Sequence, residues 1–112
     1  MKKLVSIIIP AYNEATIIGK LLISIKRQTY PFIESIVVDD SSLDNTASVA
    51  KKFTPRVYTR RRAERSVQRN FGAKVAKGEY LLFLDADMSL SPEIVEECVE
   101  VVSKDPGIGG VI

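Results

Sequence analysis

The stretch that decides the fold is Tyr80-Leu81-Leu82-Phe83-Leu84-Asp85-Ala86-Asp87, in which five apolar residues run directly into an Asp-x-Asp motif. A continuous apolar run, unlike an alternating one, predicts a strand that is covered on both faces of its sheet. Two other apolar runs have the same form. Residues 4–9 stop at Pro10, and residues 35–38 lead into Asp39-Asp40.

Helical patterns separate these apolar runs. Apolar residues recur every three or four positions between Asn13 and Ile25, and Val67, Phe71 and Val75 recur every four positions in a helix that Gly78 closes. Asp44 is expected to cap a helix over residues 45–53, and Ser91 and Pro92 to begin another, while residues 56–59 and 107–112 are predicted strands. Strands and helices alternate, which predicts one α/β domain over residues 1–112, a three-layer α/β/α sandwich with a mostly parallel sheet.

The composition narrows the chemistry. The 112 residues contain no histidine and a single cysteine, Cys98, which excludes an internal disulfide, histidine-based zinc sites and nucleophile–histidine pairs within this sequence. Cys98 lies on the apolar face of the last predicted helix, which favours an inert core thiol. The net charge of +2 and the lack of a recognisable module argue against nucleic-acid binding.

Acidic residues gather where the predicted strands end. Ligands of such sheets bind beyond the carboxyl ends of the strands, and Glu14, Asp39-Asp40 and Asp85-x-Asp87 all follow strands. Two carboxylates spaced as in Asp85 and Asp87 can share one Mg²⁺ or Mn²⁺ with the phosphates of a ligand. The simpler interpretation, that they only cap the next turn, is less favoured because a second acidic strand end accompanies them.

Other residues near the same edge are also candidates. One of Asp39 and Asp40 is expected to anchor the following loop, and the other to accept a hydrogen bond from a base or ribose. Tyr12 either stacks on a base or is a partly buried strand-end aromatic. Six arginines lie between Arg56 and Arg69. Most of them are expected on a solvated basic surface, with Arg69 directed at the acidic edge to bind diphosphate.

Together these segments resemble the inverting family 2 glycosyltransferases of the GT-A fold. The resemblance rests on residues 5–14, 36–46, 69–72 and 78–87, which follow one another at the spacing of that family. It implies a nucleotide-diphosphate sugar, typically UDP-linked, as sugar donor and Mg²⁺ or Mn²⁺ as cofactor. It implies that a nucleoside pocket is formed by Pro10, Ala11, Tyr12 and Glu14. Asp40 would recognise the base with support from Asp39, and Arg69 would contact the diphosphate. Asp85 would contact the ribose or a metal-bound water, and Asp87 would bind the metal ion.

The resemblance also implies a carboxylate base that deprotonates the acceptor hydroxyl, expected beyond Ile112. Cytoplasmic nucleotide sugars imply a cytoplasmic protein, with membrane association if longer sequence exists. One alternative is a non-catalytic nucleotide-sugar-binding module that acts with a partner chain or self-associates through an uncovered apolar face. Another is a haloacid-dehalogenase-like phosphatase with Asp85 as nucleophile. A dinucleotide-binding domain is disfavoured because the first strand lacks a following G-x-G-x-x-G.

Overall fold

Strands and helices alternate through residues 3–104, the part of the chain that the computed structural model describes. The strands form one sheet in the order β3-β2-β1-β4, and each neighbouring pair is parallel. The strands are β1 (Val5–Ala11), β2 (Ile33–Asp39), β3 (Val57–Thr59) and β4 (Tyr80–Phe83); the helices are α1 (Ile18–Lys26), α2 (Thr46–Lys51), α3 (Arg65–Val75) and α4 (Ile94–Lys104).

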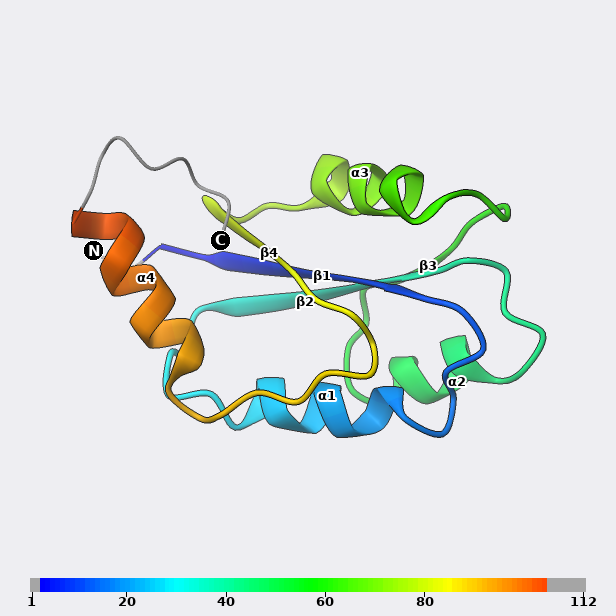
Figure 1. Cartoon of the computed structure of the whole chain (residues 1–112), viewed down its shortest axis with the longest axis horizontal. Helices are drawn as coiled ribbons and strands as arrows, with labels where there is room; N and C mark the ends of the chain where they lie inside the picture. The colour runs from blue at the N-terminus through cyan, green and yellow to red at the C-terminus, as the bar shows by residue number, and fades with distance from the viewer. Residues whose placement is uncertain (1–2, 105–112) are drawn as a thin grey trace.

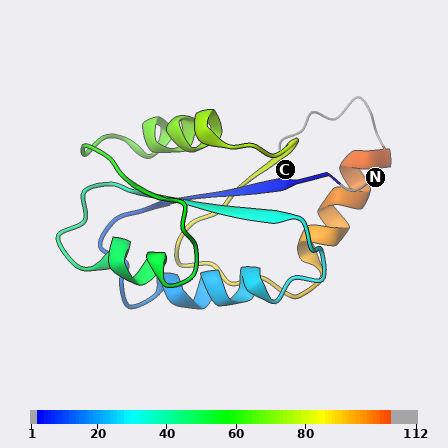
Figure 2. The ribbon, with the colours of Figure 1, turned by 180° about the vertical axis from the view of Figure 1, so that it is seen from behind.

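Helices cover both faces of the sheet, as the apolar runs predict. Helices α1 and α2 lie on one face and α3 lies on the other, while α4 lies near the amino ends of the strands (Figure 1). The view from behind shows the same three layers (Figure 2). Successive residues of β1 supply the two halves of the core, since Ile7 packs in the cluster that contains Leu21 of α1 and Ile8 packs with Phe71 of α3. The predicted three-layer α/β architecture with a parallel sheet is therefore confirmed.

A glycine sets the distance between α3 and the sheet. A Cβ atom on Gly72 would lie 2.4 Å from Cγ2 of Ile8, so no larger residue fits without movement of the helix or of β1. Residues four apart lie on the same face of a helix, and Gln68, four residues before Gly72, is also buried against the sheet. This close approach brings the first turn of α3 against the carboxyl ends of the strands.

Several predicted boundaries differ from the structure. Strand β1 continues through Pro10. The backbone nitrogen of Pro10 faces β4, but the pairing of β1 with β4 ends at Ile8, so the missing N–H of proline removes no hydrogen bond between strands. Helix α1 begins at Ile18 rather than near Asn13, because Asn13 has a φ of 53° and belongs to a turn. Helix α2 ends at Lys51, two residues short of the predicted end at Phe53.

One residue of the apolar pattern predicted for α3 does not face the core. Val67 is 49% exposed, whereas Phe71 and Val75 pack against the cluster that contains Ile8, and Gln68 and Gly72 are the fully buried residues of that helix. Cys98 of α4 is half-buried rather than part of the core as predicted, and burial raises the pKa of its thiol. The strand predicted at residues 107–112 lies outside the described residues. Within those residues, no helix has both the length and the apolar character needed to cross a membrane.

Candidate functional site

A pocket of about 590 Å³ opens at the carboxyl edge, which we define as the edge of the sheet where β1 and β2 end. Three segments meet there: the turn after β1, the first residue after β2, and the loop that leads into α3. Its lining residues are Pro10, Ala11, Tyr12, Asn13, Glu14, Ile17, Asp40, Arg62, Ala63, Arg65 and Gln68. The pocket thus brings together five of the residues predicted for nucleoside binding, namely Pro10, Ala11, Tyr12, Glu14 and Asp40.

Asp40 is the best-connected side chain of this pocket. Its Oδ1 accepts hydrogen bonds from the backbone N–H of Ala63 at 2.9 Å and from Nε2 of Gln68 at 2.6 Å. Its Oδ2 accepts one from Nη1 of Arg62 at 2.7 Å. Asp40 is buried, so these contacts offset the cost of removing its carboxylate from water. Its two oxygens therefore have different surroundings, one held inside the fold and the other held by a surface arginine.

Arg62 joins the two groups predicted to recognise a base. The centre of its guanidinium lies 3.6 Å from the centroid of the Tyr12 ring, in addition to its ion pair with Asp40. A planar cation over an aromatic face is a favourable stacking arrangement. The Arg62 side chain is 55% exposed, so its departure into solvent requires no rearrangement of the core. In this structure Arg62 covers both Tyr12 and Asp40.

Hydrogen bonds tie the loops after β1 and β2 to each other. The backbone N–H of Asn13 donates to Oγ of Ser42 at 2.9 Å, and Oδ1 of Asn13 accepts the N–H of Leu43 at 2.7 Å. Asp44 accepts the backbone N–H of Thr46 at 3.0 Å and that of Ala15 at 3.2 Å, although the N-cap residue of α2 is Asn45 rather than the predicted Asp44. These bonds fix the turn that presents the Tyr12 ring to the pocket.

Asp39 and Glu14 are used inside this loop structure. Asp39 accepts hydrogen bonds from the backbone N–H and the hydroxyl of Ser42, and from the Thr59 hydroxyl at 3.4 Å. Glu14 accepts the backbone N–H of Tyr12 at 3.2 Å. Asp39 thus anchors the loop after β2 while Asp40 faces the pocket, as the sequence predicts, with one residue of the pair in each role. Their contact with a ligand stays a prediction.

The Asp-x-Asp motif lies beside the pocket, in the turn after β4. Ala86 is buried, and Asp85 and Asp87 on either side of it lie outside the core. Asp85 Oδ1 is 2.7 Å from Nη1 of Arg65 and 3.7 Å from Nη2 of Arg69. Arg69 therefore points at the acidic edge as predicted, and its Nε is buried without a hydrogen-bond partner. Two guanidinium groups thus face one carboxylate of the motif.

These two aspartates fit a metal ion that is shared with a ligand. Among residues 3–104, no group of three or more acidic, histidine or cysteine side chains is arranged to hold an ion by itself. Mg²⁺ characteristically takes one or two carboxylates and completes its shell with phosphate oxygens and water. Arg65 already places positive charge at Asp85, where an ion bound by the motif would stand. Metal binding by Asp85 and Asp87 stays a prediction.

The six arginines from Arg56 to Arg69 make more contacts than the sequence suggests. Most of them, namely Arg60, Arg61, Arg62 and Arg65, are exposed as expected, but among the interactions described for residues 3–104 only the Arg61 guanidinium has no contact. The other five contact Glu34 (Arg56), the Phe71 ring (Arg60), Asp40 and Tyr12 (Arg62), and Asp85 (Arg65 and Arg69). Sequence reasoning missed the individual role of Arg62 and missed Gln68 altogether.

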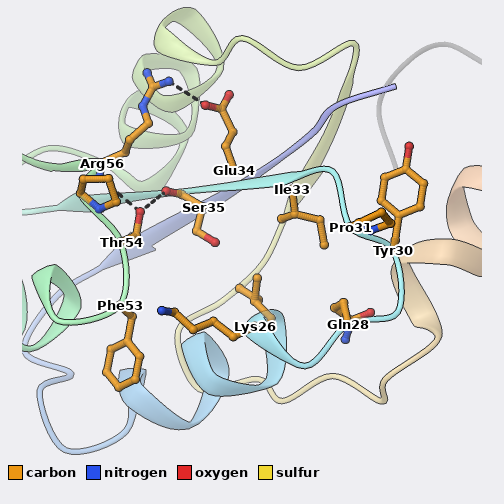
Figure 3. A pocket seen from close by; sticks show the side chains of 12 residues that line it. Lys26, Gln28, Tyr30, Pro31, Ile33, Glu34, Ser35, Phe53, Thr54 and Arg56 are labelled. Carbon is orange, nitrogen blue, oxygen red and sulfur yellow. Dashed lines mark hydrogen bonds and ion pairs between the residues drawn. The ribbon is translucent and has the colours of Figure 1, made fainter. Parts of the chain in front are cut away.

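A second hollow, of about 430 Å³, lies at the opposite end of β2 and holds none of the predicted site residues (Figure 3). Two of its charged groups are paired with each other, since Arg56 is 2.6 Å from Glu34. Burial raises the pKa of Glu34, but hydrogen bonds from Ser6 and the N–H of Lys77, together with Arg56, outweigh it and lower the pKa overall. This hollow is therefore a structural feature, and the chemistry is concentrated at the carboxyl edge.

Comparison with known proteins identifies the family of this arrangement. The model of the family described as glycosyl transferase family 2 matches residues 6–112. The chain belongs to this family. An uncharacterized glycosyltransferase of Haemophilus influenzae is 35% identical over 107 residues, covering 94% of this chain and 36% of the relative. The chain thus spans about a third of the length of the curated relatives that it matches.

Solved structures agree with the family assignment. Residues 1–349 of S. aureus TarS superpose with a TM-score of 0.83 at 29% identity, over 90% of this chain and 32% of that one. TarS has also been crystallised with UDP and with UDP-GlcNAc. The mannosyltransferase PcManGT from Pyrobaculum calidifontis, in complex with GDP-Man and Mn²⁺, superposes with a TM-score of 0.84 at 29% identity, over 97% of this chain and 34% of that one. The family match leaves the phosphatase alternative without support.

Proposed function

We propose that this chain binds a nucleoside diphosphate sugar, with UDP-sugars favoured, at the carboxyl edge of its sheet, for inverting transfer of the sugar to an acceptor hydroxyl. The observation that carries the proposal is the pairing of an aromatic face, Tyr12, with the carboxylate of Asp40 in one pocket. A base can stack on the ring while one of its N–H groups donates to the carboxylate. The nucleotide-bound forms of TarS and PcManGT support the same class of ligand.

Base binding requires Arg62 to move. Its guanidinium stacks on the ring and binds the oxygen that the base would use. The base therefore exchanges with Arg62, and the released guanidinium stays close enough to the pocket to meet a phosphate. A bidentate guanidinium suits phosphate oxygens better than it suits a base edge.

The diphosphate lies, in this proposal, between Asp85-x-Asp87 and the first turn of α3. Asp85 and Asp87 would hold Mg²⁺ or Mn²⁺, and Arg65 and Arg69 would turn from Asp85 toward the phosphates once the metal replaces them there. When bound, the metal ion supplies positive charge that stabilises the departing nucleoside diphosphate. The unpartnered Nε of Arg69 leaves a donor available for a phosphate oxygen.

Transfer further requires a base for the acceptor hydroxyl, and none of the residues assigned to the pocket has that role. A cytoplasmic location, where nucleotide sugars are made, belongs to the same proposal. The alternative is a non-catalytic module that binds nucleotide sugars and acts with a partner chain or as a self-associated assembly. Such a module would use the same pocket as the proposed enzyme but would not transfer the sugar. Release of free UDP that depends on an added acceptor favours the enzyme, and binding without any turnover favours the module.

The test of the binding site is calorimetric titration of UDP with and without Mn²⁺. We expect saturable binding that Mn²⁺ strengthens. Asp40→Ala should weaken binding in both conditions, because the base contact does not involve the metal. The proposal is wrong if neither UDP nor GDP binds, or if Asp40→Ala binds UDP as well as the unmodified protein does.

A further inference from the structure

We infer that Gln68 is a positioning residue of the base pocket: it fixes the Asp40 carboxylate so that a single oxygen, Oδ2, is presented to the base. The inference rests on the proposed function, and it concerns a residue that takes no part in the motif-based predictions. Gln68 comes from the first turns of α3, and Asp40 follows β2, so the contact joins two elements that are far apart in the sequence.

Gln68 is buried in a way that requires specific partners. Only 1% of its surface is exposed, although glutamine side chains are usually at the surface. Nε2 of Gln68 donates to Oδ1 of Asp40 at 2.6 Å and to the backbone carbonyl of Arg61 at 2.9 Å. Both partners are acceptors, which settles that the amide nitrogen, rather than the amide oxygen, faces them. Both N–H groups of the amide are therefore satisfied.

The consequence is a carboxylate with one fixed side. Oδ1 of Asp40 receives the Gln68 amide and the N–H of Ala63, and neither donor can leave without a movement of α3 or of its preceding loop. Oδ2 meets only Arg62, whose side chain is half-exposed. When Arg62 leaves, Oδ2 is the free acceptor and rotation of the carboxylate remains blocked.

A fixed acceptor at this position selects among bases. Uracil carries an N–H at its N3 position and can donate to Oδ2, whereas cytosine carries a lone pair there and would be repelled by it. Loss of the Gln68 amide would let the carboxylate turn and would weaken this selection more than it weakens stacking on Tyr12. Gln68 should therefore control the ratio of UDP to CDP affinity.

The experiment compares the UDP/CDP affinity ratio, by calorimetry with Mn²⁺, in the unmodified chain and in Gln68→Met, which keeps the side-chain length but removes the amide. We expect the unmodified chain to prefer UDP, and Gln68→Met to lower that preference by about five- to tenfold, the scale of one ordinary hydrogen bond. The matched control is Gln28→Met. The Gln28 amide makes comparable bonds, to the carbonyls of Ser24 and Ser91, away from the pocket, so its removal should leave the ratio unchanged.

A second variant covers the case in which Gln68→Met does not fold. Gln68→Asn keeps an amide but withdraws it from Asp40 by one methylene group, and it should lower the ratio as well. A folded Gln68 variant that keeps the full UDP preference would overturn the inference alone, as would an unmodified chain that binds UDP and CDP equally. Absence of nucleotide binding by the unmodified chain would overturn the proposed function itself.

Discussion

Arg62→Ala should tighten the binding of uridine, the nucleoside without phosphates. In the free protein, Arg62 occupies both the Tyr12 face and Oδ2 of Asp40, so a base must displace it. Alanine at position 62 removes this competition and leaves the ring and the carboxylate in place. Uridine is the appropriate ligand, because the charge of Arg62 would also attract the phosphates of UDP and mask the effect.

The size of the effect follows from the two contacts that are broken. A half-exposed ion pair is worth about 0.2–1 kcal/mol, and a cation–π contact near the surface about 0.5–1 kcal/mol. Together they make the displacement cost about 0.7–2 kcal/mol, which corresponds to about a three- to thirtyfold gain in uridine affinity for Arg62→Ala.

The assay is a titration of uridine followed by NMR or calorimetry, with Arg61→Ala as the matched control. Arg61 is exposed and carries the same charge one residue earlier, and its carbonyl contact with Gln68 is made by the backbone and survives the substitution. The control should bind uridine as the unmodified chain does. If Arg62→Ala binds uridine more weakly than Arg61→Ala, Arg62 holds the base rather than covering its site, and the reasoning is refuted.

Three further predictions concern stability and the metal. The pKa of Glu34 is lowered in the folded state, so its ionised carboxylate stabilises the fold at pH values above its unfolded pKa of about 4.5, and this contribution is lost as the pH falls below that value. In urea unfolding measured from about pH 6 to pH 3, the free energy of unfolding should therefore fall less in Glu34→Gln than in the unmodified chain. Gly72→Ala should lower the free energy of unfolding by about 1–3 kcal/mol through the clash with Ile8, whereas Gly19→Ala, whose added Cβ would meet Phe53 at 3.7 Å, should not; equal stability of the two variants would contradict the packing argument. Asp87→Ala should abolish the gain in UDP affinity that Mn²⁺ gives, and a gain that survives would remove Asp87 from the metal site.

The strands and the layer order could be predicted because burial on both faces leaves continuous apolar runs in the sequence. The same logic was incomplete for α3, whose inner face combines the apolar Phe71 and Val75 with Gln68 and Gly72. Gln68 is buried because Asp40 and the Arg61 carbonyl satisfy its amide, and Gly72 is buried because the helix approaches Ile8 closely. Neither residue carries an apolar signal, so the periodicity selected Val67, which faces solvent.

The acidic residues of the site could be predicted from their place after the strands, but the partners of the arginines could not. Arg56 directly precedes β3 and pairs with Glu34 near the amino end of β2, a contact between segments that lie 22 residues apart in the sequence. Arg62 reaches Tyr12 and Asp40 only because of the path of the loop before α3. A basic run in a sequence gives no information on such paths.

The central claim is that the nucleotide binds at the carboxyl edge, and the most direct test is an NMR titration of the isotope-labelled chain with UDP and Mg²⁺. We predict that the largest shifts occur at the backbone amides of Tyr12 and Ala63 and at the side-chain amide of Gln68. The amides of Gln28 and Thr54, which line the hollow at the other end of β2, should not move. Shifts concentrated at Gln28 and Thr54, or no shifts at all, would contradict the account.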